Sequence, residues 1–596
     1  MATTSELATA SDREGRLVGG IGVGAPLGRL GGQRWAARWR RARPARLALL
    51  IVLGLVTVVP IAYLIINSFN IAPPTSLTFR FGFENWVTAY TDSGTLHSIW
   101  TTLWLAVVRT ALAVPAAVLL SWLIARTNMP GAAILELGMW VAFTLPTLSL
   151  VLGWILLLDP KDGLINNALA GLPFGKHLVL NIYSYWGIIW VHLVSRAIPI
   201  QVILMTPAFR RVGARLEEVS RMCGGSKLTT LWRVTAPVIA PAILPLAMLS
   251  FISALQSIDI ELVLGIPARI YVYSTWIYNI LQDTPPQYGV ATALGAAVLV
   301  VLLGLVLIYG RFLNRREYTT VGSDFTSTPV DLGRFRWPAC ALCMGFLAVG
   351  IGIPSAAAMM GSVMRRFGFF NIPHPFTSQY WTDVLHDPIF NLSVRNSIVL
   401  GFGSAVLGIM LYAWAAHATL RSRGALRQVF NLFTWLPRGV PGVLISLAML
   451  WLFLTTPLHV VFYGTMLGLI VAMVVGGLTT GVLLASSALI QIGPELEDAS
   501  KMCGAAGPRT AVRVLLPLMS PMLLTIGTLV FLNSISEFSQ IILIYAPSSR
   551  PLSILTLEYL FNGDLERAAV LGVLMTVAVA VVALGARSLG LKLGPR

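Results

Sequence analysis

Long apolar segments recur along the whole chain, and this pattern limits the possible folds more than any other feature. Twelve runs of roughly 20 residues, enough to cross the hydrocarbon core of a bilayer as a helix, alternate with short polar gaps. The expected spans lie near residues 47–67, 99–124, 134–158, 182–207, 238–264, 289–312, 337–360, 396–418, 430–454, 461–487, 518–544 and 568–590. Because backbone groups in lipid must bond to one another, the sequence predicts an all-α, polytopic membrane protein with about 12 transmembrane helices.

The composition supports this prediction and narrows the choice of partners. Of the 596 residues, 56% are hydrophobic and 11% are charged, whereas soluble domains carry about 25% charged residues. The net charge of +17 would suit nucleic acid, but the arginines gather in short gaps between apolar runs, for example at residues 210–215 and 421–427. That distribution is typical of the positive-inside rule, so we expect a lipid bilayer and no nucleic acid as partner.

The first 46 residues differ from the rest of the chain. Residues 1–33 are rich in Gly, Ala, Ser and Thr without any periodicity, and six arginines follow between Arg34 and Arg46. We interpret residues 1–46 as a disordered basic cytoplasmic tail. The apolar run that starts at Leu47 is too long for a signal-peptide core and has no small-residue cleavage site, so it predicts an uncleaved first span.

One polar stretch occurs twice, 280 residues apart and without a gap. Residues 216–224 are Leu-Glu-Glu-Val-Ser-Arg-Met-Cys-Gly, and residues 496–504 are Leu-Glu-Asp-Ala-Ser-Lys-Met-Cys-Gly. Each copy suggests a short helix that a left-handed glycine ends, Gly224 or Gly504. In the first copy Ser226 can then cap a second short helix. A single copy would suit an ordinary charged loop, but duplication in register favours a functional element.

This stretch resembles the cytoplasmic signature loop of ABC-importer permeases, in which Glu-Ala-Ala, three residues and Gly precede a hydrophobic stretch that ends in Leu-Pro. Residues 218–220 and 498–500 stand at the acidic-Ala-Ala positions. The pattern departs from the family at Val219, at Asp498 and at Ala236-Pro237. The resemblance implies that both loops are coupling helices that dock on an ATPase, and its coupling residues are Glu217, Glu218, Gly224, Glu497, Asp498 and Gly504.

The resemblance also implies the organisation of the chain. We expect two six-helix ABC type I permease repeats, at residues 47–312 and 337–596, joined by a polar cytoplasmic linker at residues 313–336. Other features recur as well: residues 80–83 are repeated at residues 366–369, and a Leu-Pro pair in the third span is repeated in the ninth. Parallel repeats of this kind are related by an axis along the membrane normal.

Several partners follow from the same resemblance. We expect two copies of an ABC ATPase subunit, which would bind ATP and Mg²⁺, and an external solute-binding protein. The chain itself would bind no cofactor. It would lie in a bacterial inner membrane as a multi-pass protein, with both termini in the cytoplasm.

No enzyme motif or metal site is predicted. Residues 224–227, Gly-Gly-Ser-Lys, lack the glycine spacing of a phosphate-binding loop, and no His is followed by Glu, so the metalloprotease motif is missing. Cys340 and Cys343 have the C-x-x-C spacing, but no second Cys or His pair accompanies them, and we interpret them as helix-packing residues.

Ionisable residues inside spans are costly and therefore become candidates for the solute path. The residues that we single out as path candidates are Arg196, Arg438, Asp259, Glu261 and Glu537. Each arginine lies beside a proline, which can open a helix and expose backbone groups to a cavity. Two interpretations remain open: these side chains line the path, or they staple broken helices through ion pairs.

The transported solute is the least determined feature. Residues 153–158 and 163–166 resemble ferric-iron permeases, so ferric iron is the best hypothesis, and permeases for thiamine, phosphonate, sulfate or polyamine share the framework. An ion-coupled secondary transporter is the alternative from another class, but it would have no reason to duplicate a glycine corner.

Overall fold

The computed structural model describes residues 44–72, 78–172, 179–210, 219–220, 222–230, 233, 236–314, 330–493, 495–505 and 507–588. Within these residues the chain is helical, with short π and 3₁₀ segments and three isolated β-bridges but no strand. The all-α prediction is confirmed. Most of the predicted tail (residues 1–43) and of the predicted linker (residues 315–329) lies outside the described residues.

Nine helices in the described part of the chain are long and apolar enough to cross a membrane. They are Arg46–Ser68, Ser93–Arg126, Tyr185–Arg210, Tyr288–Ile308, Gly333–Gly361, Pro388–Leu420, Met466–Ile492, Ala511–Ser536 and Leu565–Ala586. Two bent helix pairs raise the count to 11. The fifth predicted span, near residues 238–264, forms α13 (Ala236–Leu255), which then breaks. Every predicted span thus coincides with a helix or a helix pair.

Prolines break the third span of each half. In the first half, α6 (Ala132–Thr144) and α7 (Thr147–Leu158) meet at 100° around Leu145 and Pro146. In the second half, α20 (Ala425–Trp435), a 3₁₀ turn (Leu436–Gly439) and α21 (Gly442–Thr455) enclose a bend of 109°. Proline offers no N–H and keeps the preceding residue extended, so a helix cannot continue through either site.

The second member of each bent pair is an interior helix. Ten consecutive residues of α7 are buried, and so are most residues of α21. Each packs against the first span of the opposite half: α7 against α17 (Ile353–Gly361), and α21 against α3 (Val59–Ser68). Gly153 permits the first of these contacts, because a Cβ there would collide with the Pro354 carbonyl. Because α3 also packs against α15 (Tyr288–Asn314), and α17 against α28 (Leu565–Ser588), each first span lies between its own half and the opposite half.

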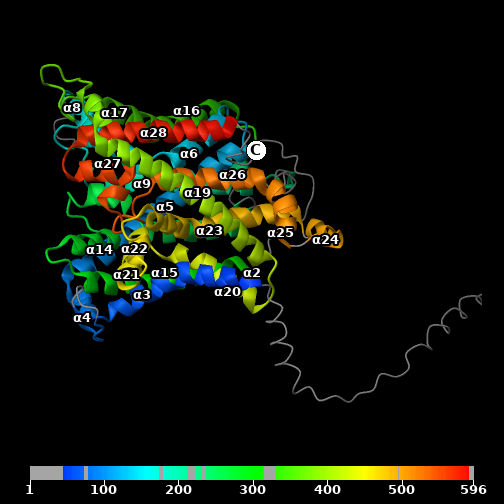
Figure 1. Cartoon of the computed structure of the whole chain (residues 1–596). Coiled ribbons are helices and arrows are strands. Elements are labelled where there is room, and N and C mark those ends of the chain that lie inside the picture. Colours follow the sequence, from blue (N-terminus) through cyan, green and yellow to red (C-terminus); the bar gives the residue numbers. More distant parts are fainter. Residues whose placement is uncertain are drawn as a thin grey trace, which may run out of the picture. The chain divides into compact units, whose positions relative to one another are not determined.

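The remaining helices repeat one packing scheme. In the first half, α5 (Ser93–Arg126) packs on α10 (Ile198–Arg210) and α13, and in the second half α19 (Pro388–Leu420) packs on α23 (Met466–Ile492) and α26 (Leu516–Ser536). Helices α15 (Tyr288–Asn314) and α28 (Leu565–Ser588) flank α13 and α26 respectively. Figure 1 shows the short helices α24 (Glu495–Met502) and α25 (Gly507–Thr510) together at one end of the second-half helices.

The described end of the predicted linker is held by the first half. The Val330 N–H donates to the Arg126 carbonyl at 2.7 Å, and the Asn128 N–H donates to the Val330 carbonyl at 3.2 Å. The Asn128 side chain also donates to Asp331 at 2.6 Å. The chain thus enters its second half, at α16 (Arg336–Leu347), from a point fastened to the loop after α5.

Candidate coupling corners and solute path

The second repeated stretch forms a tight helical corner, which we call the second corner (described residues of 495–510). Helix α24 ends where the Cys503 N–H donates to the Ala499 carbonyl at 3.1 Å, and Gly504 then takes a φ of +79°. The Ser500 and Thr510 hydroxyls are hydrogen-bonded at 2.9 Å, which ties α24 to α25. The predicted left-handed glycine is present.

The first corner (described residues of 219–230) has the same geometry. The Cys223 N–H donates to the Val219 carbonyl at 3.0 Å, Gly224 has a φ of +83°, and the Ser220 and Thr230 hydroxyls are 2.8 Å apart. The Ser226 hydroxyl accepts from the Thr229 N–H at 3.2 Å, as expected of a helix cap. Glu217 and Glu218 lie outside the described residues.

Each corner has an exposed methionine two residues before its glycine. Met222 is 87% exposed and Met502 is 90% exposed, and the neighbouring Cys223 and Cys503 are exposed as well. An unbranched thioether side chain adapts to irregular apolar surfaces, which suits it for contact with a partner. Sequence reasoning missed these methionines, although their repetition in register was a usable signal.

The two acidic residues of the second corner that were predicted to take part in coupling, Glu497 and Asp498, have different environments. Asp498 is exposed. Glu497 is buried and accepts from Arg421 Nε at 2.8 Å, while His417 Nε2 lies 3.3 Å from its other oxygen. Both partners are on the last turn of α19 or just beyond it, and Arg421 also donates to the Gly493 carbonyl at 3.3 Å. Glu497 thus braces α24 against a spanning helix.

The predicted path residues Arg196 and Asp259 form a partly exposed ion pair. Arg196 Nη1 lies 3.4 Å from Asp259 Oδ2, and the two side chains are 44% and 18% exposed. Arg196 is on a π-helical segment, Leu193–Ala197. From the helix cap to the corner glycine, the first half (Ser184 to Gly224) is one residue longer than the second half (Thr465 to Gly504). A π segment accommodates one inserted residue in a helix, and such segments occur frequently at functional sites.

The other two path candidates extend this polar region across both halves. Arg438, in the break between α20 and α21, donates to the Ser253 hydroxyl of α13 at 2.7 Å, and Gln256 donates to the Arg438 carbonyl at 2.7 Å. Glu537, at the end of α26, is close enough to Asp259 for the two carboxylates to interact. The structure therefore gathers Arg196, Asp259, Arg438 and Glu537 around the ends of α13 and α26.

Glu261 belongs to a different, fully buried cluster. Its Oε1 lies 2.9 Å from both Arg109 Nη1 and His192 Nε2, and its Oε2 accepts from Ser257 at 2.6 Å. Arg109 also donates to the Ala254 carbonyl. Because Glu261 is 0% exposed, we leave it out of the proposed path. Sequence reasoning missed Arg109 and His192, which lie 152 and 69 residues from Glu261.

Comparison with known proteins decides the family. The model of the family described as "Binding-protein-dependent transport system inner membrane component" matches residues 97–317 and again residues 393–596. The chain belongs to this family. Two matches in one chain make this permease a fused two-domain protein of the ABC importer type, as the repeated corners predicted. It is a multi-pass inner-membrane protein and a transport component.

Individual relatives are distant. The permease is 25% identical over 493 residues to "Probable ABC transporter permease protein y4fN" of Sinorhizobium fredii, covering 81% of this chain and 85% of that protein. It is 22% identical over 407 residues to "Ferric transport system permease protein FbpB" of Actinobacillus pleuropneumoniae, covering 67% and 58%. It is also 27% identical over 202 residues to "Sulfate transport system permease protein CysT" of Salmonella typhimurium, covering 33% and 70%.

Proposed function

We propose that this permease forms the membrane channel of an importer driven by two ABC ATPase subunits that bind ATP and Mg²⁺, one at each corner. An external binding protein would deliver the solute, and the corners, the linker and both termini would face the cytoplasm. The observation that carries this proposal is the corner itself, since the same φ and the same Ser–Thr hydrogen bond occur twice in one chain.

A structural route connects each corner to the path. In the second half, α25 continues through the π segment Ala511–Leu515 directly into α26, whose far end is Glu537. In the first half, the first corner precedes α13, which carries Ser253 and leads to Gln256 and Asp259. A displacement of either corner by an ATPase would therefore move a helix whose other end contacts the solute.

Ferric iron is the solute we propose, and the similarity to the ferric transport permease of Actinobacillus pleuropneumoniae supports it. A second candidate is an oxyanion such as sulfate. Two observations favour it: the path contains Arg196 and Arg438, each with a guanidinium suited to an oxyanion, and the chain resembles a sulfate permease over 202 residues.

Uptake measurements separate these candidates. Cells that express the permease with the ATPase and binding protein from its own gene neighbourhood would be given radioactive ferric iron or radioactive sulfate. We expect uptake of iron that depends on ATP and on the permease, with no competition from excess sulfate. Uptake of sulfate alone would replace the iron proposal, and uptake that persists without a functional ATPase would overturn the importer proposal.

A further inference from the structure

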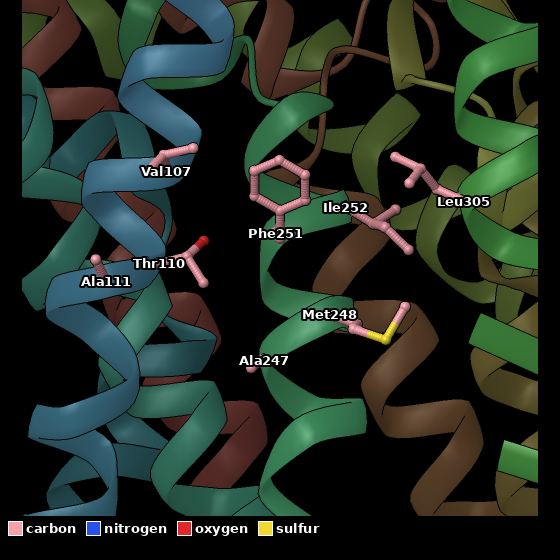
Figure 2. A pocket seen from close by; sticks show the side chains of 8 residues that line it. All are labelled: Val107, Thr110, Ala111, Ala247, Met248, Phe251, Ile252 and Leu305. Atoms are coloured by element: carbon pink, nitrogen blue, oxygen red, sulfur yellow. The ribbon is translucent and has the colours of Figure 1, made fainter. Parts of the chain in front are cut away.

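A large apolar pocket lies in the first half, among α5, α13 and α15 (Figure 2). Its volume is about 380 Å³. It is lined by Val107, Thr110, Ala111, Ala247, Met248, Phe251, Ile252 and Leu305. Thr110 supplies the one hydroxyl in this lining. All three helices are membrane-spanning or apolar, so the pocket lies at membrane depth.

At the equivalent place in the second half, two aromatic rings meet. There Phe402 of α19 packs edge-on against Phe531 of α26, with ring centroids 4.9 Å apart. The N-terminal caps Asp92 and Asp387 align α5 with α19 at an offset of 295 residues. In this alignment Val107 is the counterpart of Phe402. Phe251 matches Phe531 at the offset of 280 residues. The first half therefore keeps one ring of the pair and lacks the other.

Glycines explain the closer helix approach in the second half. A Cβ at Gly401 would lie 2.7 Å from the Phe531 ring, and one at Gly527 would lie 2.6 Å from Ile409. Alanines stand at the matching positions of the first half, Ala106 and Ala247. Two added methyl groups hold α5 and α13 apart, and the short Val107 side chain leaves the resulting gap unfilled.

The pocket lies away from the solute path. Ser253 marks the side of α13 that meets Arg438, and Gln256, just beyond the end of α13, donates to the Arg438 carbonyl. With 3.6 residues per turn, Ala247, Met248 and Phe251 lie about 120–160° around α13 from Ser253, whereas Ile252 lies about 100° from it, on the flank of the helix. Beside the pocket, α5 exposes an unbroken apolar stripe that contains Trp100, Leu103 and Val107, which are 66%, 42% and 55% exposed. An exposed apolar stripe on a spanning helix is a lipid-facing surface.

We propose that this pocket binds one acyl chain of a membrane lipid. Water does not fill an apolar cavity, and an empty one forfeits the dispersion contacts of its walls, so hydrocarbon is the available occupant. The pocket is continuous with the lipid-facing stripe of α5, because Val107 belongs to both, and an acyl chain can enter it from there. The bound chain takes the place that the Phe402 ring occupies in the second half and supports α13 where its sequence supplies no side chain.

Photolabelling tests this proposal. The full-length permease would be placed in nanodiscs that contain a phosphatidylethanolamine with a diazirine in the middle of one acyl chain, and labelled peptides would be mapped. We expect labelling at Met248 and Phe251. Val107→Phe should reduce it about tenfold, which corresponds to about 1.4 kcal/mol of lost binding free energy. Leu112→Phe, on the exposed part of α5 outside the pocket lining, is the matched control and should leave labelling unchanged.

Two further measurements keep the result decisive. Phe402→Val should create new labelling at Phe531, which tests the pocket in a second place if Val107→Phe fails to assemble. Met248→Cys, in a chain whose four cysteines are replaced, should resist a membrane-impermeant thiol reagent. Labelling that Val107→Phe does not change, or a Cys at position 248 that reacts from water, would overturn the proposal.

Discussion

The two halves of this permease share their corners and differ in the membrane core. Both corners have a left-handed glycine and a Ser–Thr hydrogen bond. The buried Arg109–Glu261–His192 cluster has no counterpart, because the matching positions of the second half are Ser404, Ile541 and, depending on the placement of the inserted residue, Ala472 or Met473. Duplication has therefore preserved the surface proposed to meet a repeated partner, whereas the interior has diverged.

The two halves hold their equivalent helices, α13 and α26, by different kinds of interaction. In the first half, charges fasten the broken fifth span to α5 and to α9 (Tyr185–His192). In the second half, α26 is instead held by close packing against α19 at Gly401 and Gly527. A helix held by a few strong bonds and a helix held by a long apolar contact should respond differently to single substitutions.

The largest effect is expected from the buried cluster. Glu261→Gln would leave Arg109 buried without its counter-charge, and breaking such a pair costs about 3–5 kcal/mol. We expect a marked fall in the apparent Tm of the purified permease. Glu537→Gln, at the position that matches Ser257, should change Tm far less because Glu537 is only partly buried.

The double variant Arg109→Met, Glu261→Met sharpens this comparison. Replacing both charges with apolar groups should recover stability, since the desolvation cost disappears together with the attraction. A Glu261→Gln protein as stable as the wild type would show that the first half does not depend on this cluster.

The next effect concerns the feature that the halves share. Gly224→Ile and Gly504→Ile should each reduce uptake at least about tenfold, because a left-handed conformation costs an L-residue about 1–2 kcal/mol and a β-branched residue more. Among the described residues, no atom beyond the two adjacent residues lies within 4 Å of a Cβ added at either glycine, so the expected loss comes from the backbone conformation.

The matched control for the corners is Gly333→Ile. Gly333 also has a positive φ, +54°, and no atom of the described residues beyond its chain neighbours lies within 4 Å of an added Cβ, but it lies outside both corners. Uptake should persist in this variant. Unequal losses for Gly224→Ile and Gly504→Ile would show that the two corners contribute differently to coupling despite their equal geometry.

A smaller effect is expected at the Glu497 brace. Glu497→Gln should increase the ATP hydrolysed per solute transported by about fivefold, because a partly exposed ion pair contributes about 1 kcal/mol. Assembly should be unaffected. Exchanging the charges, Glu497→Lys with Arg421→Glu, should restore part of the coupling. Failure of the exchange together with lost assembly would indicate a purely structural role.

The smallest effect on stability is expected in the path. Arg196→Gln breaks a partly exposed pair with Asp259 and should cost about 0.5 kcal/mol or less, and Arg438→Gln loses the hydrogen bond to Ser253. Uptake normalised to ATPase-competent complex should nevertheless fall for both variants if these side chains contact solute. Unchanged normalised uptake with reduced yield would support the alternative of helix staples.

Features that depend on neighbouring residues could be predicted from the sequence. The spans follow from local hydropathy, because a helix in lipid satisfies its own backbone and needs only enough apolar residues. The left-handed turns at Gly224 and Gly504 and the cap at Ser226 depend on a few adjacent residues. The repeat of the corner was visible because it has no insertions.

The tertiary structure decided which charges meet. Nothing local indicates that Glu261 binds Arg109 and His192, or that Glu497 binds Arg421 from 76 residues away, because those pairs depend on how helices are placed side by side. For the same reason, the contacts of each first span with the opposite half and the pocket beside Val107 could not be predicted. Hydropathy determines that a segment enters the membrane, but helix–helix packing determines which helices are its neighbours. Any apolar helix can cover an apolar helix surface, so hydropathy alone does not specify the partner.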